Sequence, residues 1–261
     1  MILLAGINGA GKTTFYYTKI KPSLVSQSRD VPFVNADEIE KSMFPDEVGD
    51  HSYTAAREAA RLRTHCFDAG LSFVTETVFS HQSKIDLIGE AQQKGFEVIL
   101  NHVHVDDPEK AIKRVNTRTQ VGGHAVPEKK VRERFPRTIE NLKLAVTKAD
   151  RAYVWDNNHK ATMSDPMHRF VFSMHLGNIN KLSSAVPKWA MTMYGEHISH
   201  FQGNRLAIID AARTSLENNS SDPNKLQVVR LLNQAGIQQE VITHLFQEYG
   251  GVPTDYLKVI E

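Results

Sequence analysis

Short apolar runs recur along the first 156 residues, and stretches of helical periodicity separate them. The runs predict strands at 2–5, 31–34, 72–75, 97–105 and 152–156. The stretches between them predict helices at 54–69, 84–94, 109–119 and 128–149. Strands that alternate with helices form βαβ units, whose right-handed crossovers bury a mostly parallel sheet between helical layers. The predicted fold class is therefore three-layer α/β.

The pattern changes after Asp156. Residues 169–175 predict another strand, and a turn at Gly177-Asn178 leads to a possible return strand at 179–182. Pro187 then opens a helix, because proline suits the first helical turn.

From about residue 200 the pattern is helical only, with breaks at 218–223 and at Gly236. We therefore expect a domain at 1–200 and a small helical appendage at 201–261. A self-contained helical pack is the simplest interpretation of the appendage. A regulator of the first domain, or a surface that docks a partner protein, is the sharper hypothesis.

Composition limits the classes of function. The chain has 31 Lys and Arg against 30 Asp and Glu, which excludes a polyelectrolyte that binds through bulk charge alone. Its single cysteine, Cys66, excludes a disulfide framework and a thiolate metal cage. No stretch approaches the roughly 20 apolar residues that span a bilayer. We expect a soluble, cytoplasmic protein in which any anion site is local.

Residues 6–13 read Gly-Ile-Asn-Gly-Ala-Gly-Lys-Thr and fit the phosphate loop G-x-x-x-x-G-K-[ST], between a strand and a helix start. Glycines let backbone N–H groups face phosphate oxygens, the lysine supplies charge, and the hydroxyl completes a Mg²⁺ shell. The loop predicts binding of a nucleoside triphosphate, taken to be ATP, with Mg²⁺. The candidate nucleotide ligands here are Asn8, Gly9, Ala10, Gly11, Lys12, Thr13 and Thr14, and Thr13 is the candidate metal ligand.

A GTPase is one alternative among phosphate-loop proteins. Residues 147–150, Thr-Lys-Ala-Asp, have the form of a base-reading motif, and 86–89, Asp-Leu-Ile-Gly, have the form of D-x-x-G. Both lie in or directly after predicted helices, whereas GTPase motifs follow buried strands. We interpret both as chance matches.

A kinase needs a carboxylate that accepts the proton of the acceptor hydroxyl. Asp37 follows the second predicted strand, and Glu76 and Thr77 follow the third, at the edge where ligands bind in open α/β sheets. The alternative for Asp37 is an N-cap of the segment 38–40. Three polar groups at two strand ends favour a site for a hydroxylated acceptor.

Residues 109–137 carry nine basic residues against three glutamates. Arg114 and Arg118 share a helix face at i, i+4 spacing, and the flexible loop 122–127 separates them from a second basic helix. This arrangement predicts a helical lid that brings arginines to the phosphates. A solvated basic face or a nucleic-acid patch is the alternative, although no aromatic residues interleave the charges.

Together these segments resemble the zeta toxin family of P-loop kinases. The matching pieces are 5–13, Asn35-Ala36-Asp37-Glu38-Ile39, Glu76-Thr77, Gly122-Gly123-His124-Ala125-Val126-Pro127 and Asp156-Asn157-Asn158. The resemblance covers about residues 1–200. It implies a three-layer P-loop kinase fold with a lid and a kinase that phosphorylates a sugar hydroxyl of UDP-N-acetylglucosamine, often paired with an antitoxin.

By that resemblance, Asp37 is the general base, Lys12 and Arg118 bind the triphosphate, and Glu76 holds the sugar. His124 stands where the founding toxins carry a second phosphate-binding arginine, and a mostly neutral imidazole stabilises phosphate charge less. That role is weaker in this chain or shifts to Arg114 or Arg132.

Two further departures affect the acceptor site and the lid. Residues 76–80 read Glu-Thr-Val-Phe-Ser, whereas the zeta-like branch of the family usually reads Glu-Thr-Thr-Leu-Ser. Either a hydroxyl that contacts the sugar is lost to Val78, or the alignment shifts by one residue and Thr77 supplies that hydroxyl. Pro136 predicts a kink or a break in the second lid helix.

Twelve histidines raise the question of a metal site. His102 and His104 share a strand face without a third ligand, and His197 and His200 do not fit H-E-x-x-H, so we interpret them as structural. An ATP-dependent kinase remains the leading hypothesis. A nucleotide-gated interaction module that hydrolyses ATP slowly is the alternative.

Overall fold

The computed structural model describes residues 1–45, 51–119, 126–159 and 167–253. A seven-stranded sheet in the order β2-β3-β1-β4-β5-β6-β7 lies at the centre of residues 1–194. The strands are β1 Ile2–Ala5, β2 Phe33–Val34, β3 Val74–Thr77, β4 Ile99–His104, β5 Arg151–Asp156, β6 Arg169–His175 and β7 Asn178–Leu182. The first five are parallel, whereas β6 and β7 are antiparallel. The predicted mostly parallel sheet is confirmed.

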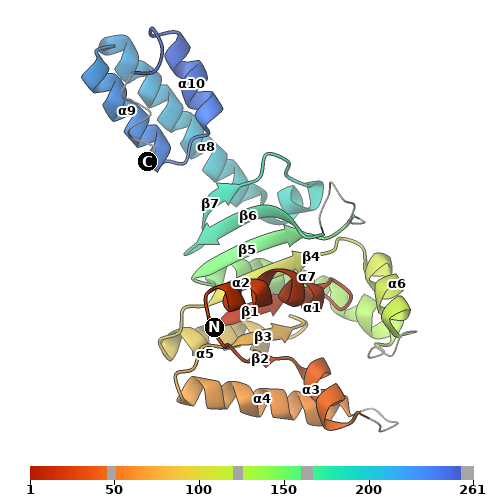
Figure 1. Cartoon of the computed structure of the whole chain (residues 1–261). Coiled ribbons are helices and arrows are strands. Elements are labelled where there is room, and N and C mark those ends of the chain that lie inside the picture. The colour runs from red at the N-terminus through yellow and green to blue at the C-terminus, as the bar shows by residue number, and fades with distance from the viewer. Residues whose placement is uncertain (46–50, 120–125, 160–166, 254–261) are drawn as a thin grey trace. The chain divides into compact units, whose positions relative to one another are not determined.

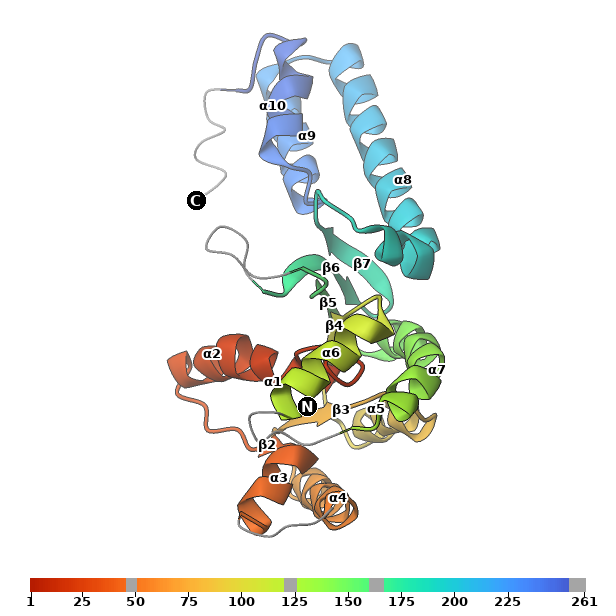
Figure 2. The same ribbon diagram turned by 90° about the vertical axis from the view of Figure 1, so that its right-hand side faces the viewer.

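Helices cover both faces of this sheet, as Figures 1 and 2 show. The helices between residues 12 and 148 are α1 Lys12–Phe15, the π-helix η1 Tyr16–Ile20, α2 Lys21–Ser26, α3 Ala36–Met43, α4 Ser52–Asp68, α5 Ser83–Gln93, α6 Pro108–Thr119 and α7 Glu128–Lys148. The continuous segment from α1 to α2 lies on one face, and α5 and α7 lie on the other. The predicted three-layer α/β class is confirmed.

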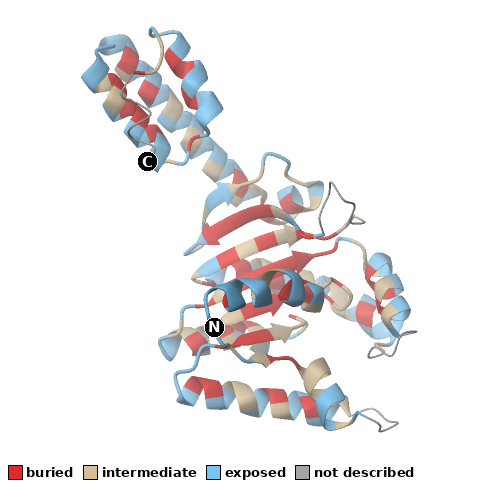
Figure 3. Cartoon of the chain, viewed as in Figure 1, coloured by how far each residue is buried: buried red, intermediate tan, exposed pale blue. Residues whose placement is uncertain are grey.

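The central strands are buried because helices lie on both sides of them (Figure 3). Leu3 and Leu4 of β1 are completely buried, which explains why β1 reads as an unbroken apolar run. Phe15 belongs to the same core as Leu4, and its ring centroid lies 5.1 Å from that of Trp155. Burial of such a side chain stabilises the fold by about 1.5–3 kcal/mol, so the core anchors the helix that follows the phosphate loop.

The antiparallel hairpin of β6 and β7 turns one residue earlier than predicted. His175 pairs with Asn178, so Leu176 and Gly177 form the two-residue loop. Their φ values are +48° and +77°. Positive φ at both central residues is typical of a type I′ turn, whose twist matches that of the flanking strands.

Helix α7 runs through Pro136 without the break that was one of the two predicted outcomes. Proline removes one helical hydrogen bond, which alone disfavours the helix. Buried side chains on both sides of it, including Val131, Thr138 and Leu142, hold the helix against the rest of the fold. Packing therefore overrides the local cost of the proline.

The chain forms two compact units, Met1–Tyr194 and Gly195–Glu261. Helix α8, Lys188–Asn218, has a non-helical residue, Tyr194, at this division. In the second unit α9 Asp222–Gln234 and α10 Gln239–Gln247 surround an apolar core of their own with part of α8. That core includes Leu216, Val229, Leu232, Ile242 and Phe246. Within the described ranges no helix has both the length and the apolar character needed to cross a bilayer.

His102 and His104 of β4 lie inside the first unit. The side chain of His104 stacks on Trp189, with ring centroids 3.7 Å apart, and His102 Nδ1 lies 3.3 Å from the Tyr194 hydroxyl. Burial lowers the pKa of His102 to about 3 and the pKa of His104 well below its ordinary value. Both imidazoles are therefore neutral in the folded chain at pH 7.

We predict that acid destabilises this fold through these two side chains. Their pKa is lower in the folded chain than in the unfolded chain, so the unfolded state binds the extra protons as pH falls below about 6.5. Between pH 7 and pH 5 His102 alone costs about 2 kcal/mol of unfolding free energy. Urea unfolding of His102→Asn at both pH values should show a pH dependence smaller by that amount. The exposed His65→Asn is the control, and an unchanged pH dependence in His102→Asn contradicts the prediction.

Candidate active site

The phosphate loop connects β1 to α1 and lies directly against α6. Gly9 has φ +76°, and a Cβ atom there would lie 2.4 Å from the carbonyl oxygen of Ala111. Only glycine tolerates both that φ and that contact. Lys12 is 5% exposed, and its Nζ donates a hydrogen bond to the Ile7 carbonyl at 3.0 Å. The lysine side chain thus reaches back across the loop.

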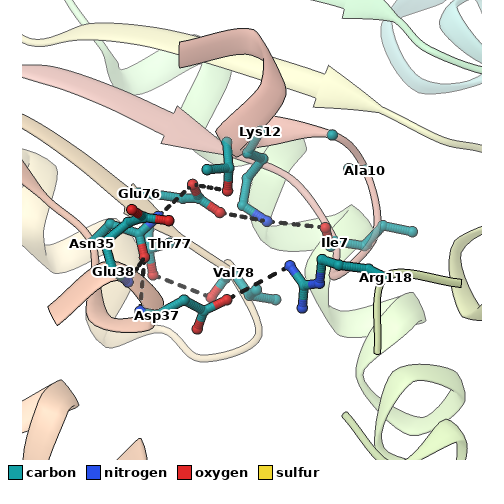
Figure 4. Close-up of polar contacts among 12 residues, drawn as sticks. Ile7, Ala10, Lys12, Asn35, Asp37, Glu38, Glu76, Thr77, Val78 and Arg118 are labelled. Carbon is teal, nitrogen blue, oxygen red and sulfur yellow. Dashed lines mark hydrogen bonds and ion pairs between the residues drawn. The ribbon is translucent and has the colours of Figure 1, made fainter. Parts of the chain in front are cut away.

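The Glu76 carboxylate at the end of β3 lies beside this loop (Figure 4). Its Oε2 accepts hydrogen bonds from the Thr13 hydroxyl and from the Asn35 amide, both at 2.8 Å. Its Oε1 lies 3.5 Å from Lys12 Nζ. The structure therefore brings together the predicted Lys12, Thr13 and Glu76, and it adds Asn35 to them.

Asp37 and Arg118 face each other beside the phosphate loop (Figure 4). The distance from Asp37 Oδ2 to Arg118 Nη1 is 3.7 Å, and both side chains are 41% exposed. Asp37 lies in the first turn of α3, and Arg118 lies in the last turn of α6. A solvent-accessible carboxylate and a guanidinium are thus available next to the phosphate loop.

Asn35 is the N-cap of α3. Its Oδ1 accepts hydrogen bonds from the N–H groups of Asp37 at 2.8 Å and Glu38 at 3.4 Å. The alternative interpretation of Asp37 as the N-cap is therefore wrong, because the residue two positions earlier does that work. The Asp37 carboxylate is left to interact with Arg118.

Thr77 is the last residue of β3, and Val78 follows it. The Thr77 hydroxyl lies 3.5 Å from the Val78 carbonyl oxygen, which is long for an O–H···O bond. The hydroxyl is half-buried and can therefore accept another partner. Figure 4 places both residues on the same side of the site as Asp37.

The remaining candidate nucleotide ligands lie in the phosphate loop or directly after it. Ala10 donates its N–H to the Ile7 carbonyl at 3.2 Å. Asn8 is half-buried, and Thr14 is exposed at the start of the helix. The predicted nucleotide ligands thus form one continuous loop.

The basic residues of the predicted lid have different partners. Arg114 Nη2 donates to the Asn157 carbonyl at 2.8 Å, and burial lowers the pKa of Arg114. Arg132 forms hydrogen bonds of 2.7 and 2.9 Å with Glu109, which join α7 to α6. Arg132 is therefore engaged in holding the two helices together. His124 and the glycines at 122 and 123 lie outside the described residues.

The two GTPase-like motifs do not form a nucleotide site. Residues 86–89 lie within α5. Asp150 directly precedes β5, and its carboxylate accepts a 2.7 Å hydrogen bond from the Val98 N–H. It therefore lies at the amino end of the sheet, opposite the phosphate loop, so both motifs are chance matches as interpreted from the sequence.

Sequence reasoning assigned no role to three residues at the site, although Asn35 and Asn157 lie in segments on which the family resemblance rests. Asn35 precedes a helix start and could have been found as a capping residue. Asn157 and His168 contact the carbonyls of Ala10 and Gly11 from the segments that follow β5 and precede β6. No local signal marks His168, because it approaches the loop only in the folded chain.

Comparison with known proteins adds a family and a fold. The model of the family described as Zeta toxin matches residues 1–165. A Haemophilus influenzae protein described as uncharacterized is 27% identical over 136 residues, which cover 51% of this chain and 91% of that protein. Among the described residues no three His, Cys, Asp or Glu side chains gather as a metal cluster.

Solved structures of the AvrRxo1-ORF1:AvrRxo1-ORF2 complex are similar in fold. The structure with ATP has a TM-score of 0.55 and 19% identity, and the match covers 75% of this chain and 62% of that chain, less than two thirds of its length. The native structure has a TM-score of 0.55 and 16% identity, over 99% of this chain and 78% of that chain. The three-layer P-loop kinase fold predicted from the sequence is confirmed.

We predict that Asn35→Ala lowers the free energy of unfolding by about 1–2 kcal/mol, because the α3 cap is lost. Asn35→Ser is the matched variant, since serine caps a helix but is too short to reach Glu76. It should recover at least half of that loss in urea unfolding. Equal losses in the two variants would show that the cap is not the source of the effect.

Proposed function

The chain belongs to the zeta toxin family, and from that premise we propose that it is an ATP- and Mg²⁺-dependent kinase acting on a hydroxyl of a small acceptor. UDP-N-acetylglucosamine is the acceptor expected of the family. The observation that carries the proposal is the convergence of Lys12, Glu76, Asp37 and Arg118 beside the phosphate loop (Figure 4). A phosphoryl donor and an acceptor both find the groups that they require there.

Asp37 is the proposed general base. Its carboxylate takes the proton of the acceptor hydroxyl while that oxygen attacks the γ-phosphorus and ADP leaves. Its exposure leaves room for an acceptor, and its capping duty falls to Asn35. Catalysis by positioning and charge stabilisation suits phosphoryl transfer, which needs little covalent chemistry from the protein.

Lys12 and Arg118 are the proposed phosphate ligands. Each cation faces a carboxylate, since Lys12 lies 3.5 Å from Glu76 and Arg118 lies 3.7 Å from Asp37. A triphosphate offers both cations more negative charge than one carboxylate does. Binding would therefore draw Arg118 from Asp37 and free the base for the acceptor.

Two hard oxygen donors fit a Mg²⁺ ion at this place. The Thr13 hydroxyl and the Glu76 carboxylate are 2.8 Å apart, and Mg²⁺ prefers oxygen ligands from one or two side chains together with phosphates. These residues would hold the ion, and when bound it supplies charge neutralisation at the β and γ phosphate oxygens.

The acceptor side is proposed to comprise Asp37, Glu76 and Thr77. Glu76 can accept hydrogen bonds from a sugar, and the Thr77 hydroxyl has one long contact at 3.5 Å. We also propose that the helices at 109–137 act as a lid and that 1–200 is the catalytic domain. An antitoxin partner stays a prediction from the family.

We predict that Asp37→Asn lowers kcat for phosphoryl transfer by about 10²–10⁴, because the proton acceptor is lost. ATP affinity should change by less than about threefold, since asparagine keeps the shape of the side chain. Glu38→Gln, one position away, is the control and should retain activity. Measurement combines a labelled-ATP transfer assay with calorimetric ATP binding, and full activity of Asp37→Asn refutes the assigned base.

We predict that UDP-N-acetylglucosamine is phosphorylated when incubated with the chain, ATP and Mg²⁺. The product is detected by mass as one added phosphate on the sugar. A parallel panel of other hydroxyl acceptors serves as the control. Transfer to another acceptor alone would retain the kinase and reject this substrate, whereas ATP hydrolysis without transfer would favour a nucleotide-gated interaction module.

A further inference from the structure

Two buried side chains contact the outer side of the phosphate loop. Asn157, just after β5, donates from Nδ2 to the Ala10 carbonyl at 2.8 Å. His168, just before β6, places Nε2 3.2 Å from the Gly11 carbonyl. Both residues are 2% exposed. The Gly11 carbonyl also accepts the Phe15 N–H at 2.9 Å, at the start of α1. Asn157 and His168 therefore contact two successive carbonyls of the loop, and His168 adds to the helical hydrogen bond on the second.

Peptide geometry gives these two contacts a consequence inside the loop. In a trans peptide the C=O and the following N–H point in opposite directions. Fixing the Ala10 carbonyl therefore fixes the Gly11 N–H, and fixing the Gly11 carbonyl fixes the Lys12 N–H. Both N–H groups point away from Asn157 and His168, and such loops bind phosphate through their N–H groups.

Gly11 is the residue that makes this approach possible. A Cβ atom at Gly11 would lie 2.6 Å from Asn157 Nδ2 and 3.2 Å from His168 Nε2. The first distance is shorter than any real Cβ contact tolerates. The glycine of the phosphate motif thus admits the two side chains on its outer side.

The contacts are made at a cost in stability. His168 has φ +63°, a left-handed conformation that costs a non-glycine residue of order 1–2 kcal/mol. Asn157 Oδ1 and His168 Nδ1 are buried without a hydrogen-bond partner in the described part of the chain. Burial lowers the pKa of His168 to about 4, so the ring is neutral and donates from Nε2. Strain and unpaired polar atoms concentrated at one place indicate a functional constraint.

Asn157 also connects the loop to the lid. Its backbone carbonyl accepts the 2.8 Å hydrogen bond from Arg114 of α6, and its N–H donates to the His104 carbonyl at 2.9 Å. The residue is thus held by the sheet and by α6 while its side chain holds the loop.

We propose that Asn157 and His168 are positioning residues that hold the Gly11 and Lys12 N–H groups toward the triphosphate. The inference rests on the proposed function only in requiring that this loop binds a nucleoside triphosphate. It assigns to this pair the preorganisation of the loop before the ligand arrives.

The test measures Mg·ATP binding by calorimetry, which needs no acceptor. Asn157→Asp is nearly isosteric but removes the donor. The exposed Asn180→Asp is its control, because it adds the same charge away from the loop and its side-chain oxygen still accepts the hydrogen bond from the Ser173 hydroxyl. His168→Phe keeps a ring without the donor, and His168→Gln restores a donor. We expect about tenfold weaker ATP binding in Asn157→Asp and His168→Phe, and binding within about threefold of the parent in the two others. All four variants should still unfold cooperatively above the assay temperature, and Asn157→Asp should have the lowest midpoint, because its carboxylate is buried.

Each outcome decides the proposal. Parent-like ATP binding in Asn157→Asp and His168→Phe overturns it while leaving the kinase intact, and so does equal weakening in His168→Gln and His168→Phe. Failure of both Asn157→Asp and His168→Phe to fold also overturns it, because the pair is then structural. If the parent binds ATP but transfers no phosphate, weaker ATP binding in Asn157→Asp and His168→Phe than in the parent supports the pair and rejects the kinase.

Discussion

The Glu76 carboxylate is the interaction on which the site depends. It accepts hydrogen bonds from Thr13 and Asn35 and faces Lys12. The segments that follow β1 and β2 are thereby joined at the end of β3. Its 13% exposure makes each of these contacts stronger than in bulk water. Without this anion, a lysine that is 5% exposed would have, among the described residues, only the Ile7 carbonyl to offset its charge.

The order of the strands makes that junction possible. β3 lies between β2 and β1, so the residues that follow β2 and those that follow β1 both lie next to the end of β3. All three strands are parallel, and their carboxyl ends therefore share one edge. Asp37 arrives at the same edge because α3 begins directly after β2, and Asn35 orients its first turn. The proximity of these side chains therefore follows from the order of the strands more than from any single loop.

Local sequence patterns predicted the parts of this fold whose causes are local. The phosphate loop, the apolar strands and the polar residues at strand ends all arise from neighbours in the chain, and the structure places them together. Asn157 belongs to a segment on which the family resemblance rests, but its contact and that of His168 were not predicted, because 147 and 157 residues separate them from the carbonyls that they contact. The break that was one of the two outcomes predicted at Pro136 does not occur, for a related reason, since the packing of α7 outweighs the local preference of proline. The N-cap role was considered for Asp37 and not for Asn35, although Asn35 directly precedes the helix and asparagine is favoured at that position.

The contact between Gly9 and Ala111 limits how α6 can move. The loop backbone fits against the Ala111 carbonyl so closely that no side chain could stand between them. The first turn of α6 therefore cannot slide past the loop without breaking the fit. Arg118 lies in the last turn of the same helix and pairs with Asp37. A tilt of α6 about Ala111 would therefore move the Arg118 guanidinium while the contact between the helix and the loop is kept.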